Sequence, residues 1–174
     1  ILHHAAAKSC GAATIHQWHL NNGWSGIGYH FVVRKNGTIE RGRPENTVGA
    51  HASGSNSDSI GICFEGDFMS ETMTDTQKNA GKELVSYLKN KYGISKVQKH
   101  SDVCSTDCPG TNFPFSEIAG ATGSATAPST SSGSDKIKVD GWWGVNTTRL
   151  LQQIFGTPVD GIVSNQDSAQ KKYL

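Results

Sequence analysis

The sequence predicts an α/β fold with a central mixed β-sheet flanked by helices, and three observations lead to this prediction. Short apolar segments that fit β-strands recur at 1–5, 27–43 and 58–68. A helical pattern with start and stop signals covers 75–92. The segments follow one another as strand, helix, hairpin, strand and helix, which is typical of a mixed sheet.

Size, charge and composition exclude several classes of protein. The 174 residues are enough for one core-forming domain and a small second one. The net charge of +1 gives no strong field for nucleic acid, and no apolar run approaches the length of a membrane span. We therefore expect neither nucleic-acid binding nor membrane insertion. Four cysteines are too few for a disulfide scaffold.

The N-terminal residues 1–5, ILHHA, fit a short buried strand. Because successive side chains of a strand point to opposite faces, only one of His3 and His4 can face a given site. Residues 12–22 then fit a short helix that Asn22-Gly23 closes. The first elements are thus a strand and a helix.

A hairpin is predicted for residues 27–43. Its Asn36-Gly37 pair is the one preferred in two-residue connections, in which both positions have positive φ. Regular alternation in its first strand separates two sets of side chains, Tyr29, Phe31 and Val33 on one face and His30 and Val32 on the other.

The next strand, within 58–68, alternates in the same way, and a helix follows it. One face of the strand carries Ile60, Ile62 and Phe64, and the other carries Gly61, Cys63 and Glu65. For the helix over 75–92, Thr74 and Gln77 predict a capping box and Gly93 predicts the end, with an apolar stripe of Ala80, Leu84 and Leu88.

A composition change divides the chain into three parts. Residues 120–134, GATGSATAPSTSSGS, are small, polar and nearly uncharged, which is typical of a flexible linker. Residues 1–119 precede it as the main domain. Residues 135–174 follow it as a partial module, in which Val-Asp-Gly occurs twice around a predicted helix at 146–155.

One histidine and two cysteines fall within nine positions of the stretch KHSDVCSTDCPG, residues 99–110. Its Ser, Thr and Asp residues and its final Pro-Gly indicate a loop, which can bring His100 and Cys108 to one point. Both side chains are good zinc ligands, and a catalytic zinc takes three protein ligands, so a histidine of the N-terminal strand can complete a site. The spacing leaves two alternatives open: free thiols, or a disulfide, Cys104–Cys108 or Cys10–Cys104.

Four blocks of sequence stand in a fixed order: LHHAA, GIGYHFVVRKNGTIERGR, VGAHASGSNSDSIGICFEGDF and HSDVCSTDCPG. Together they resemble the zinc-dependent N-acetylmuramoyl-L-alanine amidases, a family shared by phage endolysins, bacterial autolysins and peptidoglycan recognition proteins. The resemblance covers residues 1 to about 115. It implies the mixed-sheet fold of that family.

The resemblance also assigns the metal ligands and the groups that assist the reaction. The zinc ligands fall on His3, His100 and Cys108, and the catalytic tyrosine of the Gly-Tyr-His-Phe motif falls on Tyr29. Two residues before the cysteine ligand, where members carry lysine or threonine, stands Thr106. Its hydroxyl can donate a hydrogen bond to the amide oxygen but supplies no positive charge.

For several further residues the sequence leaves more than one role open. Some members place a general-base glutamate where this chain has Cys63, and Glu65 lies two residues on. Glu65 is therefore predicted to have a catalytic or substrate role, or alternatively to be a solvated carboxylate at the end of the strand. His51 is expected to contact substrate, and Asn56 either joins it or serves as a turn residue. His4 is expected to pack under the sheet or to form a hydrogen bond behind the site. Trp18 and Trp24 are expected to pack in the core or at the rim, rather than to form a platform for sugar.

The implied reaction is hydrolysis of the amide between N-acetylmuramic acid and L-alanine in bacterial peptidoglycan, with a zinc-activated water as nucleophile. The segment after the linker resembles peptidoglycan-binding modules and is expected to bind a cell-wall polymer, Trp142 and Trp143 being candidates for sugar stacking. The expected protein is a phage endolysin made in the host cytoplasm, or alternatively a secreted autolysin, and either acts on the bacterial cell wall.

Two rival classes are considered. A recognition protein of the same fold binds peptidoglycan without cutting it, and the complete zinc set with Tyr29 argues against it. A cysteine peptidase would use Cys108 or Cys63 with a histidine. The proline after Cys108 suits a ligand loop better than a nucleophile at the start of a helix.

Overall fold

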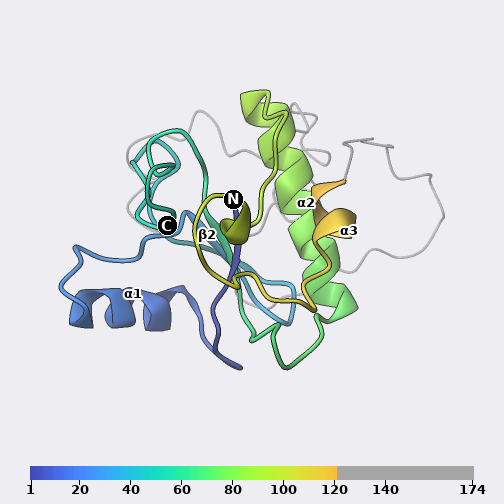
Figure 1. The fold of residues 1–174 in the computed structure, drawn as a ribbon, viewed down its shortest axis with the longest axis horizontal. Helices are drawn as coiled ribbons and strands as arrows, with labels where there is room; N and C mark the ends of the chain where they lie inside the picture. Colours follow the sequence, from blue (N-terminus) through green and yellow to red (C-terminus); the bar gives the residue numbers. More distant parts are fainter. Residues whose placement is uncertain (121–174) are drawn as a thin grey trace, which may run out of the picture. The chain divides into compact units, whose positions relative to one another are not determined.

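The computed structural model describes residues 1–120 (Figure 1). The predicted main domain, 1–119, falls inside this range. The linker beyond Gly120, the module at 135–174 and its helix at 146–155 lie outside the described residues and stay predictions.

A four-stranded sheet forms the centre of the described part, in the order β1-β4-β2-β3. Strand β4 runs parallel to both β1 and β2, whereas β2 and β3 are antiparallel. The predicted mixed sheet is therefore confirmed. The strands are short, and their bounds are β1 Leu2–His4, β2 Phe31–Val33, β3 Ile39–Arg41 and β4 Ile62–Phe64.

Helices pack on both faces of the sheet (Figure 1). The long α2 lies beside α3 on one face, and α1 belongs to the other. A single 3₁₀ turn, η1, lies between α2 and α3 in the chain. The bounds are α1 Ala12–Asn21, α2 Asp75–Tyr92, η1 His100–Asp102 and α3 Phe115–Ala119.

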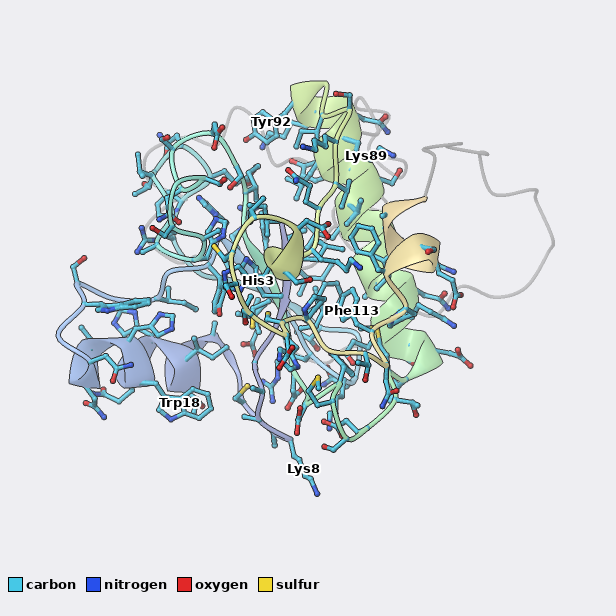
Figure 2. All side chains as sticks on the ribbon, viewed as in Figure 1. His3, Lys8, Trp18, Lys89, Tyr92 and Phe113 are labelled. Atoms are coloured by element: carbon cyan, nitrogen blue, oxygen red, sulfur yellow. The ribbon has the colours of Figure 1, made fainter. Side chains whose placement is uncertain are left out.

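The main hydrophobic core fills the face toward α2 and α3. Leu2, Phe31 and Ile62 are aligned in register across three strands and are all buried. Phe113, which follows the ligand loop in the chain, also packs in this core (Figure 2). The burial of so many large side chains is the main source of stability of the domain.

The opposite face of the sheet carries a smaller core and a histidine. In the central register row, His3, Cys63 and Val32 lie side by side and are almost completely buried. Cys10 and Ile15 cover part of this row. His3 is on the edge strand β1, where other segments can reach it.

Helix α2 begins and ends as the sequence indicates, but its cap differs from the prediction. The Thr74 hydroxyl accepts a hydrogen bond from the Gln77 N–H (3.1 Å), and Gly93 has the left-handed φ of 64°. The Gln77 side chain does not complete a capping box. It is fully buried, and its Nε2 donates to the carbonyl oxygens of Val33 and Glu65, which tie α2 to the strand ends.

The hairpin connection is longer than predicted. Gly37 has φ of 84°, but Asn36 does not have positive φ, so the two-residue turn is wrong. Lys35, Asn36 and Gly37 form a three-residue connection, in which the Gly37 N–H donates to the Arg34 carbonyl (2.9 Å). The Asn36 Oδ1 accepts from the Thr38 N–H (3.0 Å), and this local bond favours the observed turn.

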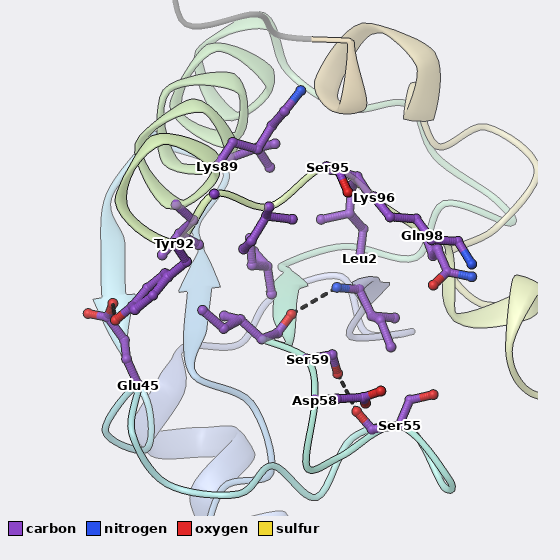
Figure 3. Close-up of a pocket in the computed structure, with 18 of the residues that line it drawn as sticks. Leu2, Glu45, Ser55, Asp58, Ser59, Lys89, Tyr92, Ser95, Lys96 and Gln98 are labelled. Carbon is purple, nitrogen blue, oxygen red and sulfur yellow. Dashed lines mark hydrogen bonds between the residues drawn. The ribbon is translucent and has the colours of Figure 1, made fainter.

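A groove of about 690 Å³ lies at one end of the sheet, between Ile1, the end of α2 and residues 93–98 (Figure 3). Its walls are mixed in polarity, with Glu45 and Tyr92 on one side. None of the predicted metal ligands lines it. Among residues 1–120, no helix combines the length and the apolar character needed to cross a membrane.

Candidate metal centre

Three separate segments bring His3, His100 and Cys108 together. His3 is fixed in β1 by the ladder to β4. The segment before η1 runs alongside β1, where the Leu2 N–H donates to the Gln98 carbonyl (2.8 Å), and so places His100 beside His3. The loop then returns, because the Ser101 N–H donates to the Cys108 carbonyl (2.9 Å).

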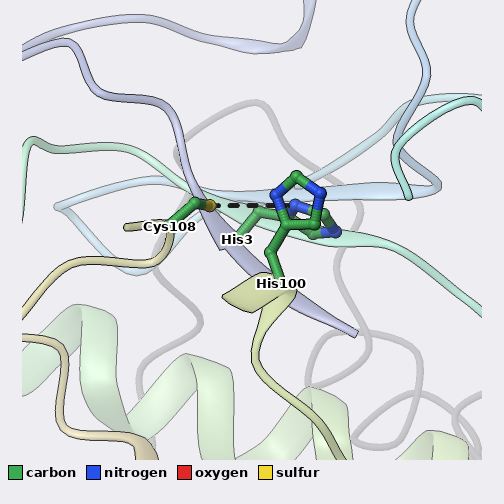
Figure 4. A group of neighbouring side chains, drawn as sticks. All are labelled: His3, His100 and Cys108. Carbon is green, nitrogen blue, oxygen red and sulfur yellow. Dashed lines mark hydrogen bonds between the residues drawn. The ribbon is translucent and has the colours of Figure 1, made fainter. Parts of the chain in front are cut away.

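The three donor atoms form a compact group (Figure 4). They all lie within 4.8 Å of one another, and the Cys108 Sγ is 3.9 Å from the His3 Nδ1. Around a tetrahedral zinc ion, bond lengths of about 2.0–2.3 Å imply about 3.5 Å between ligand atoms. A small inward movement therefore suffices to hold such an ion. His3 is buried, whereas His100 and Cys108 are half-buried, which leaves one side open.

Burial keeps His3 and Cys108 in their neutral forms, and a thiol becomes a metal ligand only when a bound cation displaces its proton. Burial lowers the pKa of His3 well below its ordinary value, and the neighbouring His51 and His100 lower it further, so its ring is neutral at neutral pH. Burial raises the pKa of the Cys108 thiol to about 11. Catalytic cysteine nucleophiles have depressed pKa values instead, so the cysteine-peptidase alternative finds no support here.

His51 determines which nitrogen of His3 faces the other donors. The His3 Nε2 lies 3.0 Å from the His51 Nδ1, while the His3 Nδ1 faces Cys108. If Nδ1 is to bind a metal, the proton of neutral His3 must sit on Nε2 and be donated to His51. His51 then carries its own proton on Nε2, a buried atom with no hydrogen-bond partner among the described residues.

The surroundings of His51 are built around its ring, and sequence reasoning missed most of them. A Cβ at Gly61 would meet the His51 ring at 2.4 Å, and one at Gly49 would meet it at 2.6 Å. Asn56 holds the same loop, since its Oδ1 accepts from the N–H groups of His51 (2.7 Å) and Ala52 (2.9 Å). These contacts fit the turn role that was the alternative for Asn56, and its contact with substrate stays a prediction. The glycines in GAHASGSN and SIGI are the feature of the sequence from which this close packing around His51 could have been predicted.

Tyr29 lies on the metal-centre face of the sheet, not on the face of Phe31 and Val33 as predicted. The alternation fails because β2 begins only at Phe31, and Tyr29 packs with the smaller core instead. Its ring centroid is 5.0 Å from that of His3. Burial raises the pKa of the Tyr29 hydroxyl well above its usual value, and a hydrogen bond with the Cys63 thiol also raises it. The hydroxyl therefore stays protonated and can donate.

Thr106 lies on the exposed part of the loop between His100 and Cys108. Its hydroxyl oxygen accepts a hydrogen bond from the Cys108 N–H (3.2 Å), so the O–H remains available as a donor. The contact ties Thr106 to the ligand cysteine. Its role toward substrate stays a prediction.

Glu65 is buried, so it is not the solvated carboxylate of the alternative prediction, and its own partners fix its carboxylate. Its carboxylate accepts from the Arg34 side chain (2.9 Å) and from the N–H groups of Cys10 (3.0 Å) and Lys35 (2.8 Å). Burial alone would raise the pKa of Glu65, but these hydrogen bonds outweigh burial and lower it. An ionised carboxylate with three donors is a weak general base, so the contacts favour a structural role over the catalytic one.

Replacing Glu65 by glutamine is expected to lower stability rather than turnover. The loss of the charged partner of Arg34 should reduce the free energy of unfolding by about 1–3 kcal/mol at neutral pH. Because the folded-state pKa of Glu65 is depressed, the difference should shrink as the pH falls through that pKa, where the wild-type carboxyl is also protonated. Urea unfolding at several pH values measures this, with the exposed Glu83→Gln on α2 as the control. A large fall in turnover of the folded variant would restore the catalytic role.

Four further side chains of the described residues have defined places: His4, His30, Trp18 and Trp24. The His4 Nδ1 accepts a hydrogen bond from the Phe68 N–H (3.2 Å), and the His4 side chain packs under the sheet, as expected. His30 bonds the Gly61 N–H and the Thr47 carbonyl, a structural role. Trp18 and Trp24 are 39% and 46% exposed, so neither belongs to the core. All four cysteines are unpaired, which leaves the disulfide alternatives without support.

Comparison with known proteins places this geometry in a family. A family model described as N-acetylmuramoyl-L-alanine amidase matches residues 1–111. The solved amidase LysC from Clostridium intestinale URNW is 49% identical to the chain. It aligns over 68% of this chain and 80% of its own, with a TM-score of 0.67.

Two curated relatives represent different branches. The endolysin of Klebsiella phage KP32 is 37% identical over 109 residues, 60% of this chain and 72% of the relative. Peptidoglycan-recognition protein SC2 of Drosophila melanogaster is 39% identical over 125 residues, 65% of this chain and 68% of the relative. With the family model covering most of the described residues, the chain belongs to the N-acetylmuramoyl-L-alanine amidase family.

Proposed function

We propose that the chain hydrolyses the amide between the lactyl group of N-acetylmuramic acid and L-alanine in bacterial peptidoglycan, with zinc as its cofactor. The observation that carries the proposal is the convergence of the donor atoms of His3, His100 and Cys108 within 4.8 Å, open on one side. These three residues would hold the zinc ion, which when bound would supply a lowered pKa for a water molecule and polarisation of the amide carbonyl. The family membership supports the same substrate class.

The side chains around the ligands supply the other functions that the reaction needs. The protonated hydroxyl of Tyr29, next to His3, donates a hydrogen bond to the amide oxygen as negative charge develops on it. Thr106 supplies a second, neutral donor from the ligand loop. His51 holds His3 in the tautomer whose Nδ1 is free to bind the metal, and we propose this positioning role in addition to substrate contact.

The rest of the chain directs the domain to its substrate. In this proposal the segment 135–174 binds a cell-wall polymer, and the linker keeps the catalytic domain at high local concentration on an insoluble wall. The similarity to phage endolysins supports a phage-encoded enzyme that acts on the bacterial cell wall. Synthesis in the host cytoplasm is part of the same proposal.

The proposal is tested on purified bacterial cell walls with the full chain. We expect turbidity to fall and new N-terminal L-alanine to be detected by mass spectrometry. Removal of metal by a chelator should stop both changes, and added zinc should restore them. Wall binding by the zinc-loaded protein without release of alanine amines would favour the recognition-protein alternative, which the similarity to SC2 leaves open.

A further inference from the structure

The chain that leads from Tyr29 into β2 departs from the regular strand pattern. The N–H groups of His30 and Phe31 both donate to the Gly61 carbonyl, at 2.9 and 3.3 Å. Two residues that share one partner on the neighbouring strand are typical of a local irregularity in the sheet. The alternation of the strand therefore does not set the direction of the Tyr29 side chain by itself, and contacts from other segments help to set it.

Gly28, the residue before Tyr29, is held from two sides. Its N–H donates to the Nδ1 of His19 on α1 (2.9 Å), and its carbonyl accepts from the Ala50 N–H (3.0 Å). A Cβ at Gly28 would overlap the Ala50 carbonyl oxygen, so the two segments are in close contact. Ala50 comes directly before His51 in the chain. The backbone of Gly28 is thus clamped between α1 and the loop that carries His51.

His19 also contacts Tyr29 through its ring. The two ring centroids are 5.7 Å apart, with the planes inclined by 46°. Burial lowers the pKa of His19, and the facing Arg43 and His16 lower it further, so the ring is neutral at neutral pH. A neutral imidazole can keep a lone pair on Nδ1, which accepts from the Gly28 N–H. One side chain therefore holds both the backbone before the tyrosine and the tyrosine ring.

We propose that His19 is a positioning residue that orients the Tyr29 hydroxyl toward the amide oxygen of the substrate. The inference rests on the proposed function, in which this hydroxyl stabilises the negative charge that develops on that oxygen. Such a donor must lie within about 2.7–3.1 Å of the oxyanion. A misplacement of about 1 Å can cost a factor of about 10² in rate. The bond to Gly28 fixes the backbone one residue before the tyrosine, and a small backbone change there is carried to the end of its long side chain.

Two substitutions at His19 separate the hydrogen bond from the general loss of the imidazole. The Oδ1 of an asparagine is as many bonds from the backbone as the Nδ1 of histidine, so it can accept from the Gly28 N–H, whereas alanine cannot. Release of alanine amines from solubilised cell-wall fragments by the full zinc-loaded chain gives kcat and KM. His19→Ala should lower kcat by about 10-fold, with KM and zinc content little changed. His19→Asn should recover most of the lost kcat.

A double substitution shows whether His19 acts through Tyr29. In the Tyr29→Phe background, His19→Ala should lower kcat no further, because the hydroxyl that it orients is absent. His16→Ala is the matched control, since His16 lies one turn earlier on α1 and its Nδ1 accepts from the Ile27 N–H (3.2 Å). This variant should keep the wild-type kcat. Urea unfolding of each variant measures any loss of stability separately from turnover.

The outcomes that contradict the inference are distinct from those that contradict the proposed function. An equal fall in kcat for His19→Ala and His19→Asn, or for His19→Ala and His16→Ala, would overturn the positioning role. So would a further fall in the Tyr29→Phe background, or no fall at all in His19→Ala. If His19→Ala does not fold, His19→Gln replaces it, because the glutamine amide lies one bond farther from the backbone. A zinc-loaded wild type that releases no alanine amines would overturn the proposed function, and the inference with it.

Discussion

Replacing Cys108 by serine is expected to abolish zinc retention and to lower the rate of amide hydrolysis by about 10³-fold or more. The reason is the loss of the soft thiolate from a set of only three ligands, which removes several kcal/mol of transition-state stabilisation. Burial raises the pKa of this thiol to about 11, so the cysteine needs a cation to become a thiolate. Elemental analysis of the purified protein and release of alanine amines measure the two effects.

Cys104→Ser is the matched control for this experiment. Cys104 lies four residues away on the same half-exposed loop, and its Sγ lies 3.8 Å from the Ser53 carbonyl oxygen. This variant should keep both zinc and activity. Full activity of Cys108→Ser without bound metal would contradict the metal centre itself. Loss of activity with zinc still bound would instead make Cys108 a reacting group.

Element types were predictable from sequence because local patterns determine them. The helix that ends at Gly93 and the strand with buried Ile62 and Phe64 follow from periodicity and caps, and both are confirmed. Side-chain partners were not predictable in the same way. The Gln77 side chain donates to two carbonyls at the strand ends instead of completing the capping box, and no local pattern contains the positions of those carbonyls.

In the candidate site, too, the residues could be named from the sequence, but the contacts of their side chains could not. Resemblance assigned His3, His100 and Cys108, and the structure brings these three together, although spacing alone left a disulfide open. Alternation placed Tyr29 on the wrong face, because the strand is irregular just before β2: the N–H groups of His30 and Phe31 both donate to the Gly61 carbonyl. The partners of Glu65 come from three distant segments, so sequence reasoning could name the carboxylate but not its use.

Tyr29→Phe is expected to lower kcat by about 10²-fold while zinc content and folding stay unchanged. A neutral donor aimed at the developing oxyanion typically contributes a factor of about 10²–10³. The substitution removes one oxygen and keeps the ring that packs against His3 and His19. Because the pKa of Tyr29 is raised well above its usual value, the donor stays protonated across the working range, and the wild-type pH profile should show no alkaline fall due to this group.

Tyr92→Phe separates the effect of the site from the general loss of a hydroxyl. The Tyr92 hydroxyl donates to the Glu45 carboxylate (2.7 Å) beside the groove at the end of α2, away from the metal ligands. This variant should retain wild-type turnover. If Tyr29→Phe also retains turnover within about threefold, the oxyanion donor must be sought elsewhere, and Thr106 is the next candidate because its O–H is free to donate. A fall in kcat without a change in zinc content is therefore the result that distinguishes a catalytic tyrosine from a packing one.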